Sequence, residues 1–124
     1  MASKNTNKAI TFISRRAPYG DSNAQLCLEM ALACAVFGQT VSYVFLDDGV
    51  YQLLKHQDAR GIDSKTLGKA LETLELYGIE NICVDADSLS ERGIQGSDLV
   101  LEVEPVSRTH IAELIHQADS VFNL

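Results

Sequence analysis

The chain has 124 residues, a length that fits one hydrophobic core, and we expect a single domain over residues 1–124. Hydrophobic residues make up 46% of the sequence and charged residues 22%, close to the averages of globular proteins, which argues against disorder. The 17 acidic residues outnumber the 10 basic ones and give a formal net charge of −7, which argues against direct binding to nucleic acid or to anionic membrane surfaces.

The start of the chain predicts a strand, a loop and a helix. Residues 8–14 (KAITFIS) are rich in β-formers, and residues 15–20 form a loop because proline and glycine interrupt the pattern. Asp21 and Ser22 are suitable N-caps for a helix that runs to about Phe37. The apolar residues that recur at helical spacing, and that we expect to be buried, are Leu26, Met30, Ala33 and Phe37.

A second strand and a turn follow. Residues 40–46 (TVSYVFL) are almost continuously apolar or β-branched, as expected for a strand covered by helices on both faces. Residues 47–49 (DDG) are a turn signal, and residues 50–54 predict a short helical turn. Residues 55–63 are polar and predict an exposed loop.

The middle of the chain repeats this alternation. Residues 64–77 predict a long helix, and residues 80–84 predict the third strand. Residues 87–92 predict a short helix capped by Asp87 or Ser88. The apolar face of the long helix consists of Leu67, Ala70, Leu71, Leu74 and Tyr77.

The end of the chain predicts two more strands and one more helix. Residues 99–103 predict the fourth strand, with Pro105 just after it, and residues 120–124 predict the last strand. Ser107 caps the helix between them. The apolar face of that helix consists of Ile111, Leu114, Ile115 and Ala118.

Strands that alternate with helices are typical of a parallel sheet with right-handed crossovers. The sequence therefore predicts an α/β fold, a small three-layer flavodoxin-like sandwich with a five-stranded, mostly parallel sheet. Ligands and partners of such sheets meet the loops at the carboxyl ends of the strands. Here these loops are residues 15–20, 47–63, 85–88 and 104–107.

The first loop carries Arg15 and Arg16 beside the start of a helix. Guanidinium groups and free backbone N–H groups both favour an anion, although the spacing matches no nucleotide-binding motif. The alternative is a solvated loop that orients the helix.

Asp47 and Asp48 follow a buried strand, and Asp85 and Asp87 follow the next one. Converging carboxylates bind Mg²⁺ or act as acid and base. The alternative is a turn with an aspartate cap, and we expect no metal and no cofactor.

The cysteines number three, and none forms a Cys-x-x-Cys pair, so reduced thiols are expected. Cys83 lies within an apolar strand and is expected to be an inert buried side chain, as are Cys27 and Cys34 on the first helix. The polar first seven residues lack the apolar core of a signal peptide, and no stretch approaches the roughly 20 apolar residues of a membrane helix. We therefore expect a cytoplasmic protein.

Residues 50–54 form a compact apolar run next to the turn. A small domain lacks the room to bury every apolar side chain, and exposed apolar patches mark partner sites. Tyr51, Leu53 and Leu54 are therefore candidates for a partner interface, and the alternative is a local cap over the sheet edge.

Four segments together resemble the TusC/DsrF branch of the DsrE/DsrF-like sulfur-relay family. Residues 45–54 (FLDDGVYQLL) resemble its DDGVYQL segment, and residues 15–20 (RRAPYG), which include Tyr19, resemble its RKAPYG loop. Residues 87–93 (DSLSERG) and the final residues 119–124 (DSVFNL) are similar to two further segments of the family.

The resemblance implies a non-catalytic subunit that assembles with TusB-like and TusD-like subunits as a dimer of heterotrimers. It also implies transfer of persulfide sulfur toward a TusE-like carrier, for 2-thiolation of the tRNA wobble uridine. A DsrF-type role in a DsrEFH complex of sulfur oxidation stays open. The family's sulfur-accepting cysteine belongs to the D/E-type subunit, so Cys83 is only a weak candidate for a sulfur acceptor here.

Overall fold

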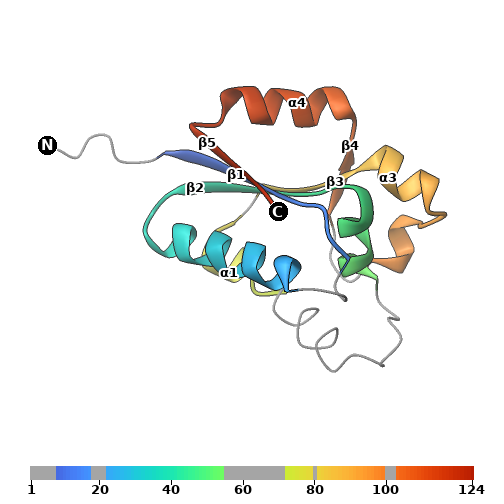
Figure 1. Cartoon of the computed structure of the whole chain (residues 1–124), viewed down its shortest axis with the longest axis horizontal. Helices are drawn as coiled ribbons and strands as arrows, with labels where there is room; N and C mark the ends of the chain where they lie inside the picture. The colour runs from blue at the N-terminus through green and yellow to red at the C-terminus, as the bar shows by residue number, and fades with distance from the viewer. Residues whose placement is uncertain (1–7, 18–21, 55–71, 80, 100–102) are drawn as a thin grey trace, which may run out of the picture.

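The computed structural model describes residues 8–17, 22–54, 72–79, 81–99 and 103–124. Five parallel strands form one sheet in the order β4-β3-β2-β1-β5 (Figure 1). The strands are β1 (Ala9–Ser14), β2 (Thr40–Phe45), β3 (Asn81–Asp85), β4 (Glu104–Val106) and β5 (Ser120–Asn123). The expected α/β class with five parallel strands is confirmed, although the order differs from the 2-1-3-4-5 of flavodoxin itself.

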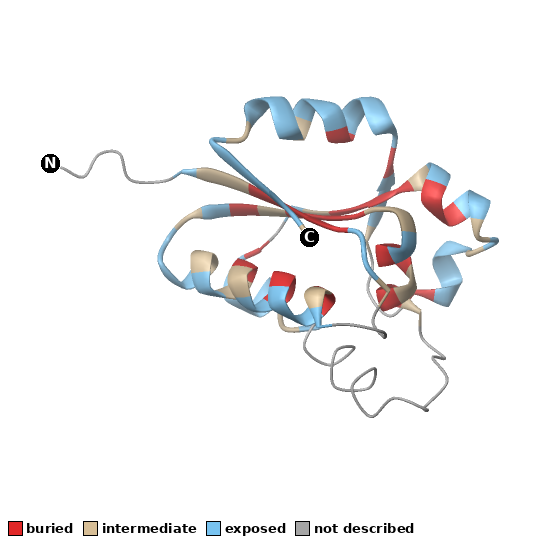
Figure 2. Ribbon diagram, viewed as in Figure 1, coloured by how far each residue is buried: buried red, intermediate tan, exposed pale blue. Residues whose placement is uncertain are grey.

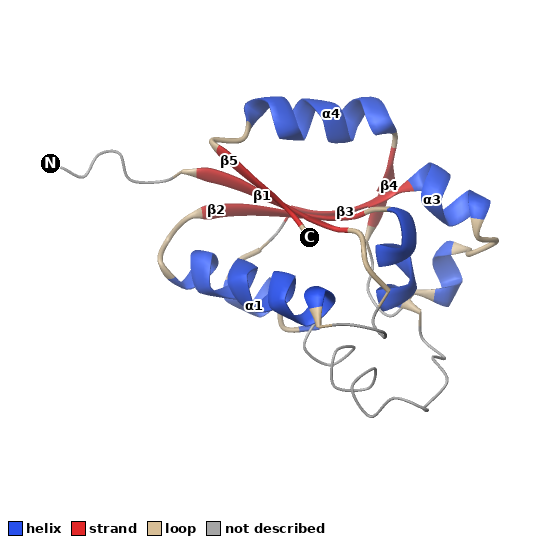
Figure 3. Cartoon of the chain, viewed as in Figure 1, coloured by secondary structure: helices blue, strands red, loops and turns tan. Residues whose placement is uncertain are grey.

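The two longer described helices cover opposite faces of the sheet (Figure 3). The connection through α1 (Asn23–Val36) steps from β1 to β2, whereas the connection through α4 (Arg108–Gln117) steps back from β4 to β5. Right-handed crossovers in opposite directions place their helices on opposite faces. The short elements are α3 (Ala86–Glu91) and the 3-10 turns η1 (Asp47–Leu53), η2 (Glu75–Tyr77) and η3 (Gly96–Asp98).

Each face of the sheet has its own core, because successive strand residues point to opposite sides. The larger core lies between α1 and the sheet and contains Phe12, Tyr43 and Phe45 from the central strands. The smaller core packs against α4 (Figure 2). Its buried members are Ile13, Val44, Cys83, Val106 and Ile111.

The predicted buried stripe of the first helix is confirmed only at Met30, which is partly buried against the larger core, whereas Leu26, Ala33 and Phe37 are exposed. Leu26 is 45% exposed and Phe37 is 81% exposed. The face of α1 that packs on the sheet consists of Ala24, Cys27, Leu28 and Ala31. Because apolar residues surround this helix on nearly all sides, helical spacing alone does not distinguish the two faces.

The candidates for a partner interface after the second strand differ in their burial. Val50 and Leu53 are fully buried in the larger core, so Leu53 is a core residue in this structure. Tyr51 and Leu54 are partly buried. The turn begins at Asp47, three residues earlier than predicted, and its tight winding directs Val50 and Leu53 inward together.

Several predicted boundaries move by a few residues. The N-cap of α3 is Asp85 rather than Asp87 or Ser88. The fourth strand is β4, and Pro105 lies inside it; this is tolerated because β4 is an edge strand, where a missing N–H costs no ladder bond. Leu99, the predicted start of that strand, makes only an isolated antiparallel bridge with Leu54.

The predictions for the helices after the second strand are confirmed in part. Leu74 and Ile111 are buried as expected, whereas Tyr77 and Ile115 are exposed. The predicted cap of the last helix is confirmed, since the Ser107 hydroxyl accepts a hydrogen bond from the backbone N–H of His110 at 3.2 Å. The predicted loop 55–63 and most of the helix 64–77 lie outside the described residues. In the described part of the chain, no helix has the length and apolar content needed to cross a bilayer.

The first test concerns Gly49, which packs against the end of β1. A Cβ atom at this position would overlap the backbone carbonyl oxygen of Ser14. We expect Gly49→Ala to lower the free energy of unfolding by about 1–3 kcal/mol, measured by urea denaturation. Gly96→Ala is the matched control, because nothing lies within 4 Å of its Cβ position. Equal stability of the two variants would contradict the packing of η1 described above.

Candidate functional site

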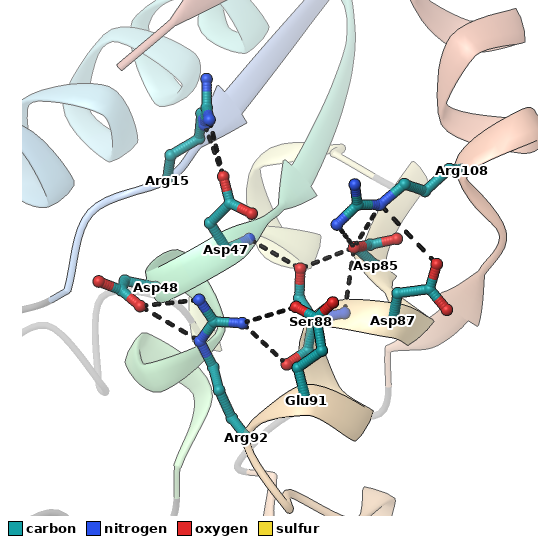
Figure 4. Close-up of polar contacts among 9 residues, drawn as sticks. All are labelled: Arg15, Asp47, Asp48, Asp85, Asp87, Ser88, Glu91, Arg92 and Arg108. Atoms are coloured by element: carbon teal, nitrogen blue, oxygen red, sulfur yellow. Dashed lines mark hydrogen bonds and ion pairs between the residues drawn. The ribbon is translucent and has the colours of Figure 1, made fainter.

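Charged side chains that follow β1, β2 and β3 pair with one another near the start of α4 (Figure 4). Parallel strands bring their carboxyl ends to one edge of a sheet, so residues far apart in the sequence meet there. Three aspartates each accept hydrogen bonds from a different arginine: Asp47 from Arg15, Asp48 from Arg92, and Asp85 from Arg108. We call these six residues, together with Ser88, the three-pair cluster.

The first pair joins the loop after β1 to the start of η1. Oδ2 of Asp47 accepts hydrogen bonds from Nε of Arg15 at 3.0 Å and from Nη2 at 2.7 Å. The backbone φ of Asp47 is 52°, in the left-handed region that aspartate tolerates better than most residues. The Arg15 side chain is 47% exposed, so this pair orients the two loops more than it stabilises the fold.

The second pair joins the end of α3 to η1. Nε and Nη2 of Arg92 donate to Oδ1 of Asp48 at 3.2 and 2.9 Å, and Nη1 donates to the Ser88 carbonyl at 3.2 Å. The same guanidinium lies 5.9 Å from the centroid of the Tyr51 ring, within the range of a cation–π contact. The hydrogen bond to Asp48 raises the pKa of Arg92.

The third pair holds a fully buried carboxylate. Oδ2 of Asp85 accepts hydrogen bonds from the backbone N–H of Ser88 at 3.1 Å and from Nε of Arg108 at 3.2 Å. The first of these bonds caps α3. The hydrogen bond to Asp85 raises the pKa of Arg108. The other oxygen, Oδ1, is buried and has no hydrogen-bond partner among the residues that the structure describes.

The Ser88 hydroxyl links two of these pairs. It accepts a hydrogen bond from the backbone N–H of Asp47 at 2.9 Å and donates one to Oδ2 of Asp85 at 2.6 Å. One fully buried hydroxyl therefore ties the end of β2 to the end of β3.

An open cavity of about 550 Å³ adjoins the cluster. It is lined by Arg15, Arg16, Asn23, Asp47, Asp48, Asn123 and Leu124. These residues follow β1 and β2, begin α1 and end β5, which places the cavity where the strand order reverses between β1 and β5. Open α/β sheets bind ligands at this position. Because the lining carries two arginines and two aspartates, its charges offset, and the anion site at Arg15 and Arg16 stays a prediction.

The metal-site interpretation of the aspartates is not supported. Within the ranges that the structure describes, no group of three His, Cys, Asp or Glu side chains is arranged to hold a metal ion. Asp47, Asp48 and Asp85 each face a separate arginine. The arrangement resembles a set of structural ion pairs that join neighbouring segments, rather than an acid and a base that act on one substrate.

Sequence reasoning placed only part of this site. The structure brings Arg15, Asp47 and Asp48 together, whereas Tyr19 lies outside the described residues. Ser88, Arg92 and Arg108 were missed. A signal existed for two of them, because Ser88 and Arg92 are four residues apart on a short helix after a strand and therefore share one face.

The three cysteines are all among the described residues. Cys83 is 1% exposed on β3, faces α4, and donates a hydrogen bond from its thiol to Oδ1 of Asn81 at 3.4 Å. Burial raises the pKa of the Cys83 thiol, and the negative charge of Glu104 raises it further. Burial also raises the pKa of Cys27, an effect that the neighbouring Tyr43 and Ser14 hydroxyls partly offset. The thiolate is the reactive form, so both thiols are poor nucleophiles near neutral pH.

The second test measures the reactivity of Cys83 directly. A Cys27→Ser, Cys34→Ser variant retains Cys83 as its single thiol. We expect alkylation at pH 7 to be at least roughly tenfold slower in the folded protein than in urea, because burial blocks access and each pKa unit lowers the thiolate fraction tenfold. The rate should rise only as the pH passes above the usual pKa of a thiol. Rapid labelling of the folded protein at pH 7 would contradict the buried, protonated thiol.

Comparison with known proteins identifies the family. The model of the DsrE/DsrF-like family matches residues 8–124. The intracellular sulfur oxidation protein DsrF of Allochromatium vinosum is 38% identical, over 94% of this chain and 96% of that protein. The TusC homologue of Vibrio parahaemolyticus is 32% identical over 92% of this chain and 97% of its own length. The TusC homologue of Pseudomonas aeruginosa is 33% identical over 95% of this chain and 99% of its own length.

A solved structure agrees with the fold. The ychN protein of E. coli superposes with a TM-score of 0.78 at 21% identity, covering 94% of this chain and 99% of that one. The match to the family model, over residues 8–124, spans all five strands of the sheet. The chain is a member of the DsrE/DsrF-like family, which includes sulfur-relay proteins.

Proposed function

We propose that this chain is a non-catalytic subunit of a cytoplasmic TusBCD-type complex, a dimer of heterotrimers with TusB-like and TusD-like subunits. The complex passes persulfide sulfur toward a TusE-like carrier for 2-thiolation of the tRNA wobble uridine. The relatives named TusC support this assignment. The observation that carries the non-catalytic role is the position of Cys83, which is buried in the core beneath α4 rather than exposed in a loop after a strand.

The three-pair cluster supports the same role. Each of its carboxylates contacts an arginine of this chain, and its hydrogen bonds join β2, β3, α3 and α4 to one another. Such ties hold the loops at the carboxyl ends of the strands in fixed positions. A subunit that orients its neighbours needs rigid loops more than it needs a nucleophile. Tyr51 and Leu54, which are partly exposed, remain candidates for subunit contacts.

A second candidate function is a DsrF-type subunit of a DsrEFH complex in sulfur oxidation. The specific observation in its favour is the 38% identity to a relative named intracellular sulfur oxidation protein DsrF, compared with 32% and 33% to two TusC homologues. A third candidate makes Cys83 itself a sulfur acceptor, and it requires α4 to move away from β3 because the thiol is covered there.

The third test is assembly. We expect coexpression with the TusB-like and TusD-like proteins of the same organism to give one complex that contains all three chains in equal numbers, with the mass of two heterotrimers by native mass spectrometry. The three chains expressed separately and then mixed serve as the control for specificity. A chain that stays monomeric in the presence of both partners would overturn the proposal.

The fourth test is performed in cells. Deletion of this chain should remove 2-thiouridine from the tRNAs that carry it, measured by nucleoside mass spectrometry. Cys83→Ser should restore the modification to near the wild-type level, because the thiol is expected to take no part in transfer. The chosen substitution keeps a small side chain at a buried position.

The other outcomes separate the alternatives. Unchanged 2-thiouridine after deletion, with loss of sulfur oxidation, would favour the DsrEFH role. A Cys83→Ser protein that assembles normally but fails to restore 2-thiouridine would identify Cys83 as a sulfur acceptor.

A further inference from the structure

The outer surface of α1 is polar at Gln25 and Glu29 and otherwise largely apolar, although it faces solvent. Its only charged residue is Glu29, and its inner face already supplies the contacts to the larger core. Near its carboxyl end, Val36 is 64% exposed and Phe37 is 81% exposed. A helix that is apolar on all sides is typical of a helix that is buried on all sides. In Figure 2 the inward side of α1 is buried, whereas its outer side is exposed.

A second element adds to this surface. The turn η2 contacts α1, and on it Leu76 is 84% exposed and Tyr77 is 48% exposed. We call Val36, Phe37, Leu76 and Tyr77 the α1–η2 patch. These residues shortly precede the first residues of β2 and β3, so the patch lies at the amino ends of the strands. It is therefore at the opposite edge of the sheet from the three-pair cluster.

The charged side chains on the patch's own two segments are acidic, although the basic residue Lys8 also lies at this edge of the sheet, where its backbone N–H donates to Oε1 of Gln39 at 2.9 Å. In the described segments 23–38 and 72–79, every charged side chain is acidic, and these side chains are Glu29, Glu72 and Glu75. All three are exposed. An apolar centre that contains aromatic side chains within a charged rim is the usual composition of a protein–protein interface. Monomeric proteins expose such patches mainly where a partner binds.

We propose that the α1–η2 patch docks a different protein subunit, one whose apolar surface is bordered by lysine and arginine side chains. A second copy of this chain fits poorly, because it brings the same acidic rim and a further net charge of −7 to the contact. The inference rests on the proposed function, since it assigns to one face of the chain the contact that a TusBCD-type assembly requires.

The fifth test compares variants within the three-chain complex. We expect Phe37→Asp and Leu76→Asp each to weaken binding to the TusB-like and TusD-like partners by roughly tenfold or more, because each places a charge in the apolar centre. Both side chains are almost fully exposed, so these variants should fold normally, as checked by circular dichroism and thermal unfolding. Ile115→Asp is the matched control. Ile115 lies on α4, which covers the opposite face of the sheet, and its side chain is 38% exposed. We expect this variant to bind within about twofold of wild type.

Two further measurements test which protein binds the α1–η2 patch. Glu72→Lys with Glu75→Lys should slow association several-fold at low salt and reduce its salt dependence, because the rim would then repel a basic partner. The isolated wild-type chain should sediment as a monomer, and hydrogen exchange at residues 33–38 and 74–78 should slow only when the partners bind.

The results distinguish this inference from the proposed function. If the wild-type chain binds neither partner, the inference and the proposed function are both wrong. If the wild-type complex forms and Phe37→Asp and Leu76→Asp bind as tightly as wild type, only the docking surface is wrong. A dimer of the isolated chain that Phe37→Asp dissociates would identify a second copy as the occupant. Protection of residues 33–38 and 74–78 that is already complete in the isolated chain would show that the chain covers its own patch. Either of these two results would overturn the inference.

Discussion

The packing of η1 against the end of β1 sets the geometry of the whole carboxyl edge. Gly49 lies so close to the Ser14 carbonyl that no side chain fits between them, and the Leu46 N–H donates to that same carbonyl at 3.1 Å. Gln52 adds bonds from its Nε2 to the Ser14 hydroxyl at 2.7 Å and to the Arg16 carbonyl at 2.8 Å. With the turn fixed in this way, Asp47 and Asp48 point outward to their arginines while Val50 and Leu53 enter the core.

The three-pair cluster depends on this turn and in return ties it to the rest of the sheet edge. Exposed ion pairs contribute little free energy individually, so Arg15 with Asp47 is chiefly a positional contact. The buried members differ, because the Asp85 carboxylate and the Ser88 hydroxyl are removed from water and must be satisfied within the protein. Their hydrogen bonds link the end of β2 to the end of β3 at this edge of the sheet.

The elements that the sequence predicts well are those with one unambiguous signal. The strands β1, β2, β3 and β5 have continuous β-forming runs, and Ser107 is a typical cap, so all of these were placed close to their observed positions, whereas β4 begins at Glu104, after the predicted residues 99–103. The buried face of α1 was assigned wrongly because this helix is apolar on both sides, and Phe37 is exposed although its spacing suits a core position. Pro105 was expected outside the strand because the edge position that tolerates it depends on the order of strands, a long-range property.

The candidate site was predictable only in part for the same reason. Arg15, Asp47 and Asp48 lie in loops that any parallel sheet brings to one edge, so their proximity follows from the predicted topology. The partners Arg92 and Arg108 reach the site from helices whose rotation and entry angle are set by packing, which local patterns do not encode. Acidic turns therefore indicate where the carboxylates gather, whereas they do not predict the arginines that pair with them.

The distribution of apolar residues also explains why the Cys83 thiol is buried. It lies on the face of the sheet that α4 covers, in a small core whose described members include Ile13, Val44 and Ile111. Exposing the thiol for sulfur transfer would require α4 to leave β3 and would expose Ile13, Val44 and Ile111 to water. Burying an aliphatic side chain is worth roughly 1.5–3 kcal/mol, so this opening would cost much of the stability of a small domain.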